Sequence, residues 1–364
     1  MAERDISAAL QQQVLDAMQG ATPLNITGSS SKFFLGHTAQ AQPIDVSTHR
    51  GIVEYDPREL VLTARSGTTL QEIETTLAEA NQMLAFEPPH FGASATLGGT
   101  IACGLSGPRR PYNGSARDFV LGCKLLNGRG EVMRFGGQVI KNVAGYDVSR
   151  LMTGAHGTLG ILLEISLKVL PRPAASITVA RQCSPAEAIA SMSGLLSKPH
   201  PVDGACYHGD HCYVRISGSA QAVKEARTKI PGDVMADAEK FWHALREHEL
   251  PFFRHATHNG KATLYRIMVK PATPPLLIEG SWLLDWGGAQ RWLYSPEDIA
   301  AIRHRVELAG GHVTVFRGGN HPDKIQQPEI FQPLPAPLMT IHQRLKASFD
   351  PQNIFNRGRM YANL

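Results

Sequence analysis

Cysteine is scarce in this sequence, and the few cysteines present do not form a metal site. The 364 residues include five cysteines, and no two of them form a C-x-x-C pair or share a repeated spacing. This pattern excludes the ligand sets of zinc sites and iron–sulfur clusters, and we expect no metal. An odd, scattered set is typical of reduced thiols, so we expect a cytoplasmic protein without disulfides.

Long runs of like charge and long apolar runs are also missing. The net charge is only +4, and no five like charges stand together, which argues against a nucleic-acid binder. The N-terminus carries acidic residues where a signal peptide needs basic ones. The uncharged stretch 88–108 holds five glycines and three prolines and would be a poor membrane helix. We therefore expect any membrane association to be peripheral, on the inner face of the inner membrane.

The length and composition predict two globular domains. Hydrophobic residues make up 43% of the 364 residues and charged residues 19%, and a domain takes roughly 150 residues. The Pro171-Arg172-Pro173 segment marks a boundary. We expect one domain over 1–173, a second over 174–345, and a C-terminal tail over 346–364 that returns to the first.

Glycine is abundant and unevenly placed. Of the 34 glycines, 15 lie between Gly92 and Gly160. Glycine within a folded domain marks backbone that turns at positive φ or approaches another group closely. Two interpretations remain open from the glycines alone: a loop-rich β domain, or a cofactor lying against the main chain.

The first half of the sequence contains three segments that suit a nucleotide. The predicted strand 24–27 runs into Gly28-Ser29-Ser30-Ser31-Lys32, whose N–H and O–H donors and cation suit a pyrophosphate. Neither a P-loop nor G-x-G-x-x-G is present. The small-residue run 93–104 offers nearly bare backbone, and Gly154-Ala155-His156-Gly157-Thr158-Leu159-Gly160 precedes a predicted strand over 161–169.

Local signals predict several elements around these segments. Helical spacing covers 5–19 and ends at Gly20, and Thr69 with Glu72 predicts a capping box. Strands over 61–64, 120–126 and 131–135 are predicted, the last two joined in a hairpin. In the second half, Ser184 and Ser295 are predicted N-caps, each followed by proline, near strands at 212–216, 281–286 and 313–316. These indicate an α+β domain with a mostly antiparallel sheet.

The order of the three glycine-containing segments resembles the FAD-binding domain of the vanillyl-alcohol oxidase (PCMH-type) flavoproteins. Asn142-Val143-Ala144-Gly145-Tyr146-Asp147 followed by the 154–161 run is similar to the branch with FAD-linked glycolate and D-lactate dehydrogenases. Segments 286–292, 331–335 and 349–356 extend the likeness, over nearly the whole chain, to FAD-binding subunits of bacterial glycolate dehydrogenase complexes.

This resemblance implies a fold and a set of cofactor-binding residues. The fold is α+β: an FAD-binding domain of two α+β subdomains, plus a second α+β domain with an antiparallel sheet and helices. The residues implied to contact FAD are Thr27, Gly28, Ser29, Ser30 and Ser31 at the pyrophosphate, Thr96, Gly98 and Gly99 along the flavin and ribityl chain, and Gly157, Gly160 and Ile161 through backbone, with Ile161 near the adenine. Arg117 and Lys141 are implied counter-charges to phosphate or else surface charges, and the resemblance implies that Asn356 and Arg359 close over the flavin from the tail.

Departures from the family pattern refine this expectation. Relatives with a covalent flavin carry a histidine in or just after the first loop, but here His37 lies beyond it, so we expect non-covalent FAD. The tail reads Asn356-Arg357-Gly358 instead of N-P-G. The H-x-G-D-G-N-like motif, which supplies a base and a metal in self-sufficient members, is not found, so catalytic residues stay unassigned. His255 and His258 are interpreted as solvated side chains and not as metal ligands.

Three functions remain in contention. The first is an FAD-binding subunit of a glycolate dehydrogenase, with a larger FAD-containing D-type subunit, an iron–sulfur F-type subunit, and a quinone or other non-oxygen acceptor. The second is a self-sufficient 2-hydroxy-acid oxidase or dehydrogenase, with Arg110, Arg291 or Arg317 holding the carboxylate. The third is a scaffold subunit without FAD, against which the intact glycine runs argue.

Overall fold

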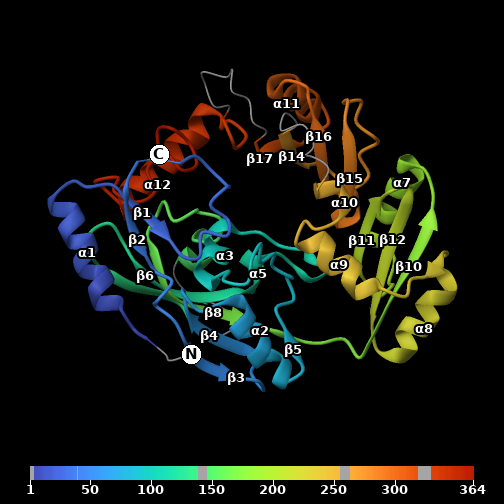
Figure 1. Ribbon diagram of the computed structural model, residues 1–364, viewed down its shortest axis with the longest axis horizontal. Helices are drawn as coiled ribbons and strands as arrows, with labels where there is room; N and C mark the ends of the chain where they lie inside the picture. Colours follow the sequence, from blue (N-terminus) through green and yellow to red (C-terminus); the bar gives the residue numbers. More distant parts are fainter. Residues whose placement is uncertain (1–3, 39, 138–145, 255–262, 319–328) are drawn as a thin grey trace. The chain divides into compact units, whose positions relative to one another are not determined.

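The computed structural model describes residues 4–38, 40–137, 146–254, 263–318 and 329–364 (Figure 1). The chain divides into two compact units. Unit 1 comprises Met1–Ser106, Gly114–Arg172 and Pro333–Leu364, and unit 2 comprises Gly107–Asn113 and Pro173–Gln332. Lys141, segment 142–145, His255 and His258 lie outside the described residues.

Unit 1 is built on a five-stranded antiparallel sheet with the strand order β3-β4-β8-β6-β7. Its strands are β3 (Ile52–Asp56), β4 (Val61–Arg65), β6 (Val120–Leu126), β7 (Val132–Gly136) and β8 (Ile161–Lys168). Two short pairs accompany it: parallel β1 (Leu24–Thr27) with β2 (Gln42–Asp45), and antiparallel β5 (Gln82–Met83) with β9 (Leu170–Pro171).

Strand β8 is apolar almost throughout because it faces two separate cores. Leu162 and Ile165 join the core that contains α2 and α3, whereas Ile161 and Leu163 join the core that contains α1, β1 and β2. The register of β8 against β6 shifts between Leu162 and Glu164, and this irregularity places Leu162 and Ile165 on the same side. Side chains alternate between the faces of a strand, so a central strand covered on both sides reads as a continuous apolar run. The helices of unit 1 are α1 (Ser7–Gln19), α2 (Leu70–Glu79), α3 (Leu97–Cys103), α5 (Ala116–Phe119), α6 (Val148–Leu151) and α12 (Ala336–Phe349).

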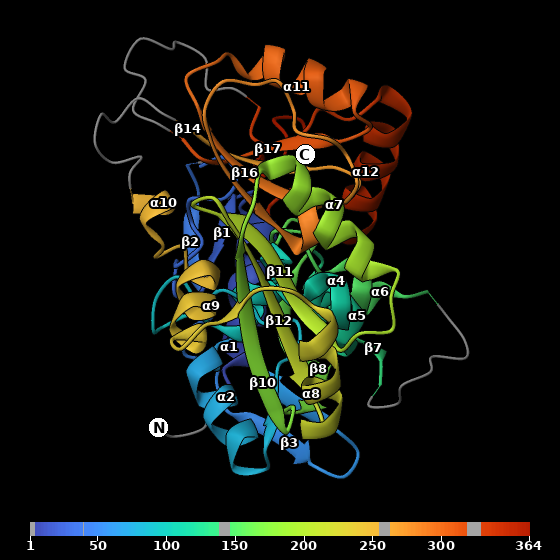
Figure 2. The same cartoon turned by 90° about the vertical axis from the view of Figure 1, so that its right-hand side faces the viewer.

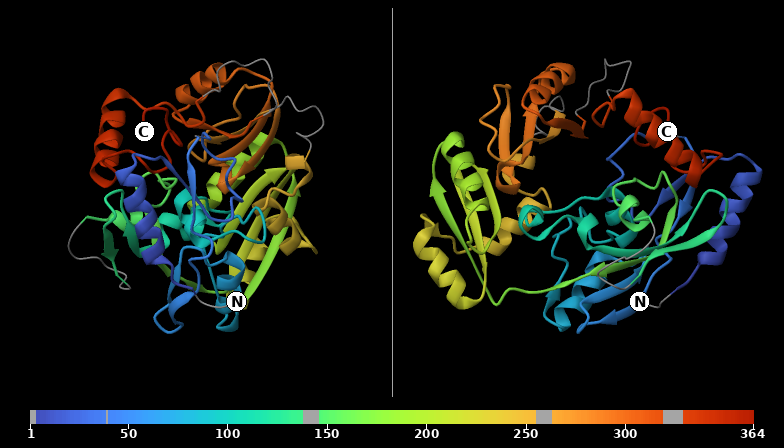
Figure 3. Two further views of the ribbon diagram at one scale, coloured as in Figure 1. Left: turned by 60° about the vertical axis from the view of Figure 1, so that its left-hand side comes forward. Right: turned by 180° about the vertical axis from the view of Figure 1, so that it is seen from behind.

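The C-terminal tail folds onto the beginning of the chain. Phe355 bridges to Leu24 in β1, and Ile354 and Phe355 are buried in the core that α1 covers. Figure 3 shows this segment beside β1. Residues more than 300 positions apart in the sequence therefore share one core.

Three local predictions for unit 1 need correction. Helix α1 ends at Gln19, but Gly20 keeps a right-handed φ of −84° and the left-handed residue is Ala21, with φ +49°. Thr69 caps α2 by accepting the Glu72 N–H, while the Glu72 carboxylate pairs with Arg50 at 3.1 Å. Most of the predicted bare run 93–104 forms helix α3.

Unit 2 contains an eight-stranded antiparallel sheet with the order β13-β10-β12-β11-β15-β16-β14-β17. Its strands are β10 (Ala175–Gln182), β11 (Val202–His208), β12 (His211–Gly218), β13 (Asp233–Val234), β14 (Thr263–Met268), β15 (Ser281–Asp285), β16 (Gln290–Ser295) and β17 (His312–Arg317). Its helices are α4 (Arg110–Asn113), α7 (Pro185–Leu196), α8 (Ala220–Lys229), α9 (Ala238–Arg246), α10 (Pro251–Arg254) and α11 (Ile299–Leu308).

Helices α7 and α8 pack on strands β10, β11 and β12, and α11 packs on β14 and β17 (Figure 2). Ser184 caps α7, as predicted, and the structure adds a reciprocal capping box with Glu187. The second predicted cap is wrong: Ser295 ends β16, and Asp298 caps α11 by accepting the Ala300 N–H. The pairing of β16 holds Ser295 in the sheet, which overrides its local capping preference.

Candidate functional site

A cavity of about 880 Å³, including space open to solvent, lies within unit 1. It is lined by 11 of the 12 residues predicted to bind the cofactor: Thr27, Gly28, Ser29, Ser30, Ser31, Thr96, Gly98, Gly99, Gly157, Gly160 and Ile161. Asn356 and Arg359 from the tail also line it. The structure thus brings together segments that lie about 130 residues apart in the sequence. It also adds the tail, which lies more than 300 residues after the Gly28 loop.

Arg117 is the predicted residue that the structure does not bring to the cavity. It lies on the exposed side of α5, whose neighbouring Ala116 and Phe119 are buried. The Ser115 N–H donates to the Asp118 carboxylate at 2.8 Å and fixes this short helix. Because Ala116 and Phe119 occupy the inner side, the Arg117 side chain faces solvent.

The loop after β1 contributes hydroxyls and one buried cation. Ser30 adopts a left-handed φ of +59°, which turns the chain directly after Gly28-Ser29. The Lys32 side chain is buried, and its Nζ donates to the His90 carbonyl at 3.1 Å. Lys32 and Arg359 contribute positive charge to the described lining, which includes no aspartate or glutamate. This charge balance suits a ligand with phosphate groups.

Two glycines allow the loop, helix α3 and the end of β4 to approach closely. A Cβ on Gly28 would lie 2.6 Å from Thr96 Oγ1, and a Cβ on Gly98 would lie 2.6 Å from Ser66 Cβ. The Gly98 N–H donates to the Ser66 carbonyl at 2.7 Å. A larger residue at either position would separate these segments, so the walls of the cavity depend on the absence of side chains.

Ser66 is a lining residue that the sequence reasoning missed. Its Oγ is buried and has no hydrogen-bond partner among the residues that the structure describes. Buried hydroxyls normally have partners, so this one is available to a bound ligand. FAD, with its many donors and acceptors, fits a wall that combines this hydroxyl with the glycine cradle. The only local signal was a serine at the end of a predicted strand.

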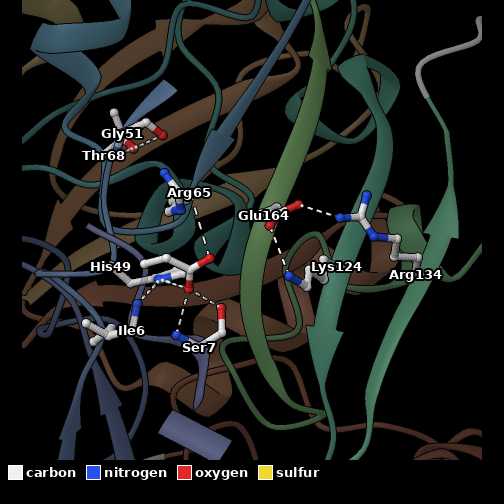
Figure 4. A network of polar contacts seen from close by, with 10 residues as sticks. Ile6, Ser7, His49, Gly51, Arg65, Thr68, Lys124, Arg134 and Glu164 are labelled. Carbon is white, nitrogen blue, oxygen red and sulfur yellow. Dashed lines mark hydrogen bonds and ion pairs between the residues drawn. The ribbon is translucent and has the colours of Figure 1, made fainter. Parts of the chain in front are cut away.

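A polar network holds the turn that carries Ser66. The His49 carbonyl accepts the Gly67 N–H at 2.7 Å, and Asp5 lies 3.7 Å from His49 Nδ1 and 3.8 Å from Arg65. On the same sheet, Glu164 pairs with Lys124 at 3.1 Å and with Arg134 at 3.2 Å (Figure 4). A Cβ on Gly67 would lie within 2.7 Å of three carbonyl oxygens, so this turn requires glycine.

Asn356 connects two walls of the cavity. Its Oδ1 accepts the Ile26 N–H and its Nδ2 donates to the His156 carbonyl, each at 2.7 Å. Its φ of +41° is left-handed, a conformation that asparagine tolerates better than most residues. Arg359 lies 4.7 Å from the Phe33 ring and donates to the Phe33 carbonyl at 3.0 Å.

A buried ion pair anchors this tail. Lys346 Nζ donates to Asp350 at 2.6 Å and to the carbonyls of Thr158 and Phe355, each at 2.7 Å. Asp350 in turn accepts the N–H groups of Ile354 and Phe355. The pair therefore ties α12 and the tail to the segment that forms another wall of the cavity.

Two titratable groups of the cavity are uncharged at neutral pH. Burial, with a smaller contribution from Arg359, lowers the pKa of His156 to about 4. Burial raises the pKa of the Cys103 thiol, although Lys32 and Arg359 oppose this shift. Neither group adds negative charge against a phosphate-bearing ligand. His156 lies inside the recognised glycine run, whereas nothing local to Cys103 indicated its place in the cavity.

The arginines considered as carboxylate clamps lie in unit 2. Arg291 is buried and donates to the carbonyls of Gly288 at 3.1 Å and Pro274 at 2.9 Å, so it stabilises a turn. Arg110 lies 4.4 Å from the Trp286 ring, and Arg317 lies 5.7 Å from the Phe316 ring.

Two further features are absent from the part of the chain that the structure describes. No group of three or more His, Cys, Asp or Glu side chains there could hold a metal ion. Within the same ranges, every helix is too short or too polar to cross a membrane.

Comparisons with known proteins agree with this site. Residues 6–136 match the family described as FAD binding domain. The chain is 49% identical over 362 residues to glycolate oxidase subunit GlcE of Escherichia coli (strain K12), covering 100% of this chain and 99% of the relative. It is 37% identical over 124 residues to glycolate oxidase subunit GlcD of Bacillus subtilis (strain 168), covering 34% of this chain and 26% of that protein.

Another relative shares only part of the chain. D-lactate dehydrogenase of Anaerostipes hadrus is 33% identical over 137 residues, covering 37% of this chain and 28% of the relative. A solved structure of alkyldihydroxyacetonephosphate synthase superimposes with a TM-score of 0.67 at 14% identity, covering 95% of this chain and 74% of the other, which establishes the likeness in fold. The full-length identity, the matched FAD binding domain and the cavity lead to one conclusion: the chain belongs to the family of glycolate oxidase subunit GlcE.

Proposed function

We propose that this chain is the FAD-binding subunit of a complex that oxidises glycolate to glyoxylate. The observation that carries the proposal is the 49% identity to a glycolate oxidase subunit along the whole chain. The cavity in unit 1 supports it, because its walls combine a glycine cradle, hydroxyls and two cations. The cofactor is non-covalent FAD, held by the 11 predicted residues together with Ser66, Asn356 and Arg359.

The residues of this chain bind and position the cofactor. Bound FAD would supply a two-electron acceptor for the complex, whose oxidation of glycolate to glyoxylate removes a hydride from C2 and a proton from the hydroxyl. Lys32 and Arg359 offset the charge of the pyrophosphate, and the hydroxyls of the Gly28 loop and Ser66 donate to it or to the ribityl chain. Asn356 holds β1 against the 154–160 segment and limits the entry of water. The base that takes the hydroxyl proton is not assigned to this chain.

We propose that the complex contains two further kinds of subunit. A larger FAD-containing D-type subunit would carry the catalytic base, and the likeness to a GlcD protein over 124 residues supports a related partner. An iron–sulfur F-type subunit would relay electrons to a quinone or another acceptor, since the five cysteines of this chain lack cluster spacing. All five cysteines are free thiols, which suits a cytoplasmic complex with at most peripheral contact with the inner membrane.

The visible absorption spectrum of the purified chain, recorded with and without added FAD, tests cofactor binding. We expect a bound-flavin spectrum that is lost in the Gly98→Val variant. Anaerobic glycolate should leave this spectrum unchanged for the chain alone and bleach it when the D-type and F-type subunits are co-expressed. Bleaching of the chain alone would favour a self-sufficient oxidase, and absence of flavin under all conditions would leave only a scaffold.

A further inference from the structure

Unit 2 contains a second cavity, of about 590 Å³ including space open to solvent. It lies at helices α7 and α8 and strands β10 and β12, and all its described lining residues fall between positions 181 and 231. Its apolar lining includes Leu195, Val214 and Ile230, each buried in the core of these elements. The cavity is therefore independent of the FAD site in unit 1.

Four basic side chains line this cavity, and no acidic residue does so in the described chain. Arg181 comes from β10, Lys198 and His200 follow α7, and Lys229 is the last residue of α8. Within the described ranges, no ion pair involves Arg181, Lys198 or Lys229.

Other cations of unit 2 do have acidic partners. Asp203 accepts from Arg215 at 2.8 Å and pairs with Arg109 at 2.7 Å, and Arg305 pairs with Glu297 at 2.8 Å. Like charges around one cavity repel one another unless an anion lies between them. The described lining of the second cavity instead gathers positive charge without an acidic residue, and Glu187, which lies outside this lining at the start of α7, interacts electrostatically with Arg181.

A glycine lies on the lining of this cavity beside open space. Gly194 lies within α7, where glycine disfavours the helix relative to alanine, and a Cβ added there would meet no atom within 4 Å. The open space beside Gly194 adjoins Ser191, which lies one turn earlier on α7 and lines the same cavity. A structural role alone would favour alanine or a larger residue at this position.

Helix ends explain only part of the arrangement. Lys198 and Lys229 lie near the C-termini of α7 and α8, where cations interact favourably with the last carbonyls. This does not account for Arg181, which projects from a strand, or for His200, nor for the empty space beside Gly194.

We propose that this cavity binds a small multivalent oxyanion, either phosphate or a di- or tricarboxylate. The Arg181 guanidinium and the Lys229 ammonium would supply the main charge-assisted hydrogen bonds, with Lys198, His200 and Ser191 completing the site. Binding is non-covalent. The nearby Cys212 thiol is buried and its pKa is raised to about 12, so it is not a nucleophile at neutral pH.

Isothermal titration calorimetry of the FAD-saturated full-length chain tests this site, because saturation with FAD blocks anion binding in unit 1. Inorganic phosphate and citrate are titrated separately, with chloride holding the ionic strength constant. The variants are Arg181→Gln with Lys229→Gln, and separately Gly194→Leu, which fills the space without removing charge. Lys224→Gln is the matched control, because Lys224 is exposed on α8 and does not line the cavity.

We expect one saturable site in the wild-type chain, with affinity lowered about tenfold or more by the double variant and by Gly194→Leu. Lys224→Gln should bind like the wild type. Tighter binding of phosphate or of citrate identifies which oxyanion chemistry the site prefers. The proposal is overturned if neither anion binds above the chloride background, or if Lys224→Gln weakens binding as much as the cavity variants. Far-UV circular dichroism and the flavin spectrum confirm that each variant is folded.

Discussion

Substituting Asn356 by alanine should loosen the cavity of unit 1. The change removes the acceptor of the Ile26 N–H and the donor to the His156 carbonyl, both at 2.7 Å. Leaving one of these part-buried backbone groups unpaired costs about 1–3 kcal/mol, so losing both bonds should lower the free energy of unfolding of unit 1 by at most about 2–6 kcal/mol. FAD should also bind more weakly, because β1 leads directly into the Gly28 loop.

Asn353→Ala provides a matched control in the same tail. Asn353 also has a left-handed φ, of +51°, so alanine meets a similar backbone strain at both positions. Its Oδ1, however, is buried without a partner in the described part of the chain, so the substitution removes no side-chain hydrogen bond at that atom. The difference between the two variants therefore isolates the two bonds made by Asn356.

Urea unfolding measures this difference with two signals. Release of FAD fluorescence reports on unit 1, and tryptophan emission reports on unit 2, because all four tryptophans lie there (Trp242, Trp282, Trp286 and Trp292). We expect flavin release at a clearly lower urea concentration for Asn356→Ala than for Asn353→Ala. If both variants release flavin at the same urea concentration, the two hydrogen bonds do not hold the cavity together and the reasoning is refuted.

Three further predictions follow from the same site. The pKa of His156 is lowered from 6.5 to about 4 in the folded chain, so the unfolded chain binds more protons between these pH values. The free energy of unfolding should therefore fall by at most about 3 kcal/mol as the pH drops from 6.5 to about 4. The His156→Asn variant should show a smaller decline when thermal unfolding is measured over this pH range. Lys346→Met leaves Asp350 buried without its cation and should destabilise unit 1 by about 3–5 kcal/mol in urea unfolding. Gly98→Val should abolish FAD binding in an equilibrium titration because its side chain would overlap Ser66, and retained micromolar binding would contradict this.

The segments that line the cavity of unit 1 were predictable because close approach of backbone leaves a local trace in the sequence. Gly28 and Gly98 are needed where chain meets chain, and this need appears in the sequence whatever the distant partner is. The largely apolar run 161–169 likewise predicted a strand, and the structure shows that this strand, β8, lies at the centre of the sheet of unit 1. The eleven predicted lining residues come from three runs that each carry such a signal.

Local signals failed where a distant partner decided the outcome. Ser295 has the sequence context of an N-cap, but its place in β16 beside β14 moved the start of α11 to Asp298. Arg117 is a plausible phosphate partner by charge, yet the burial of Ala116 and Phe119 turns it outward. Propensity and charge are weak guides whenever packing fixes which side of a short helix faces the core.

The sequence by itself indicated the cofactor class and the fold family through its resemblance to the PCMH-type flavoproteins. It also marked most of the segments that line the cavity, since main-chain approach demands glycine and small residues at fixed places. Only the tertiary structure decided that the Ser66 hydroxyl lines the cavity, that Asn356 joins two walls, and that Lys346 reaches the Thr158 carbonyl 188 positions away. It alone also gathered Arg181, Lys198, His200 and Lys229 around one cavity. The physical reason is that side-chain partners are set by the packing of sheets and helices, and spacing along the chain carries no record of such long-range contacts.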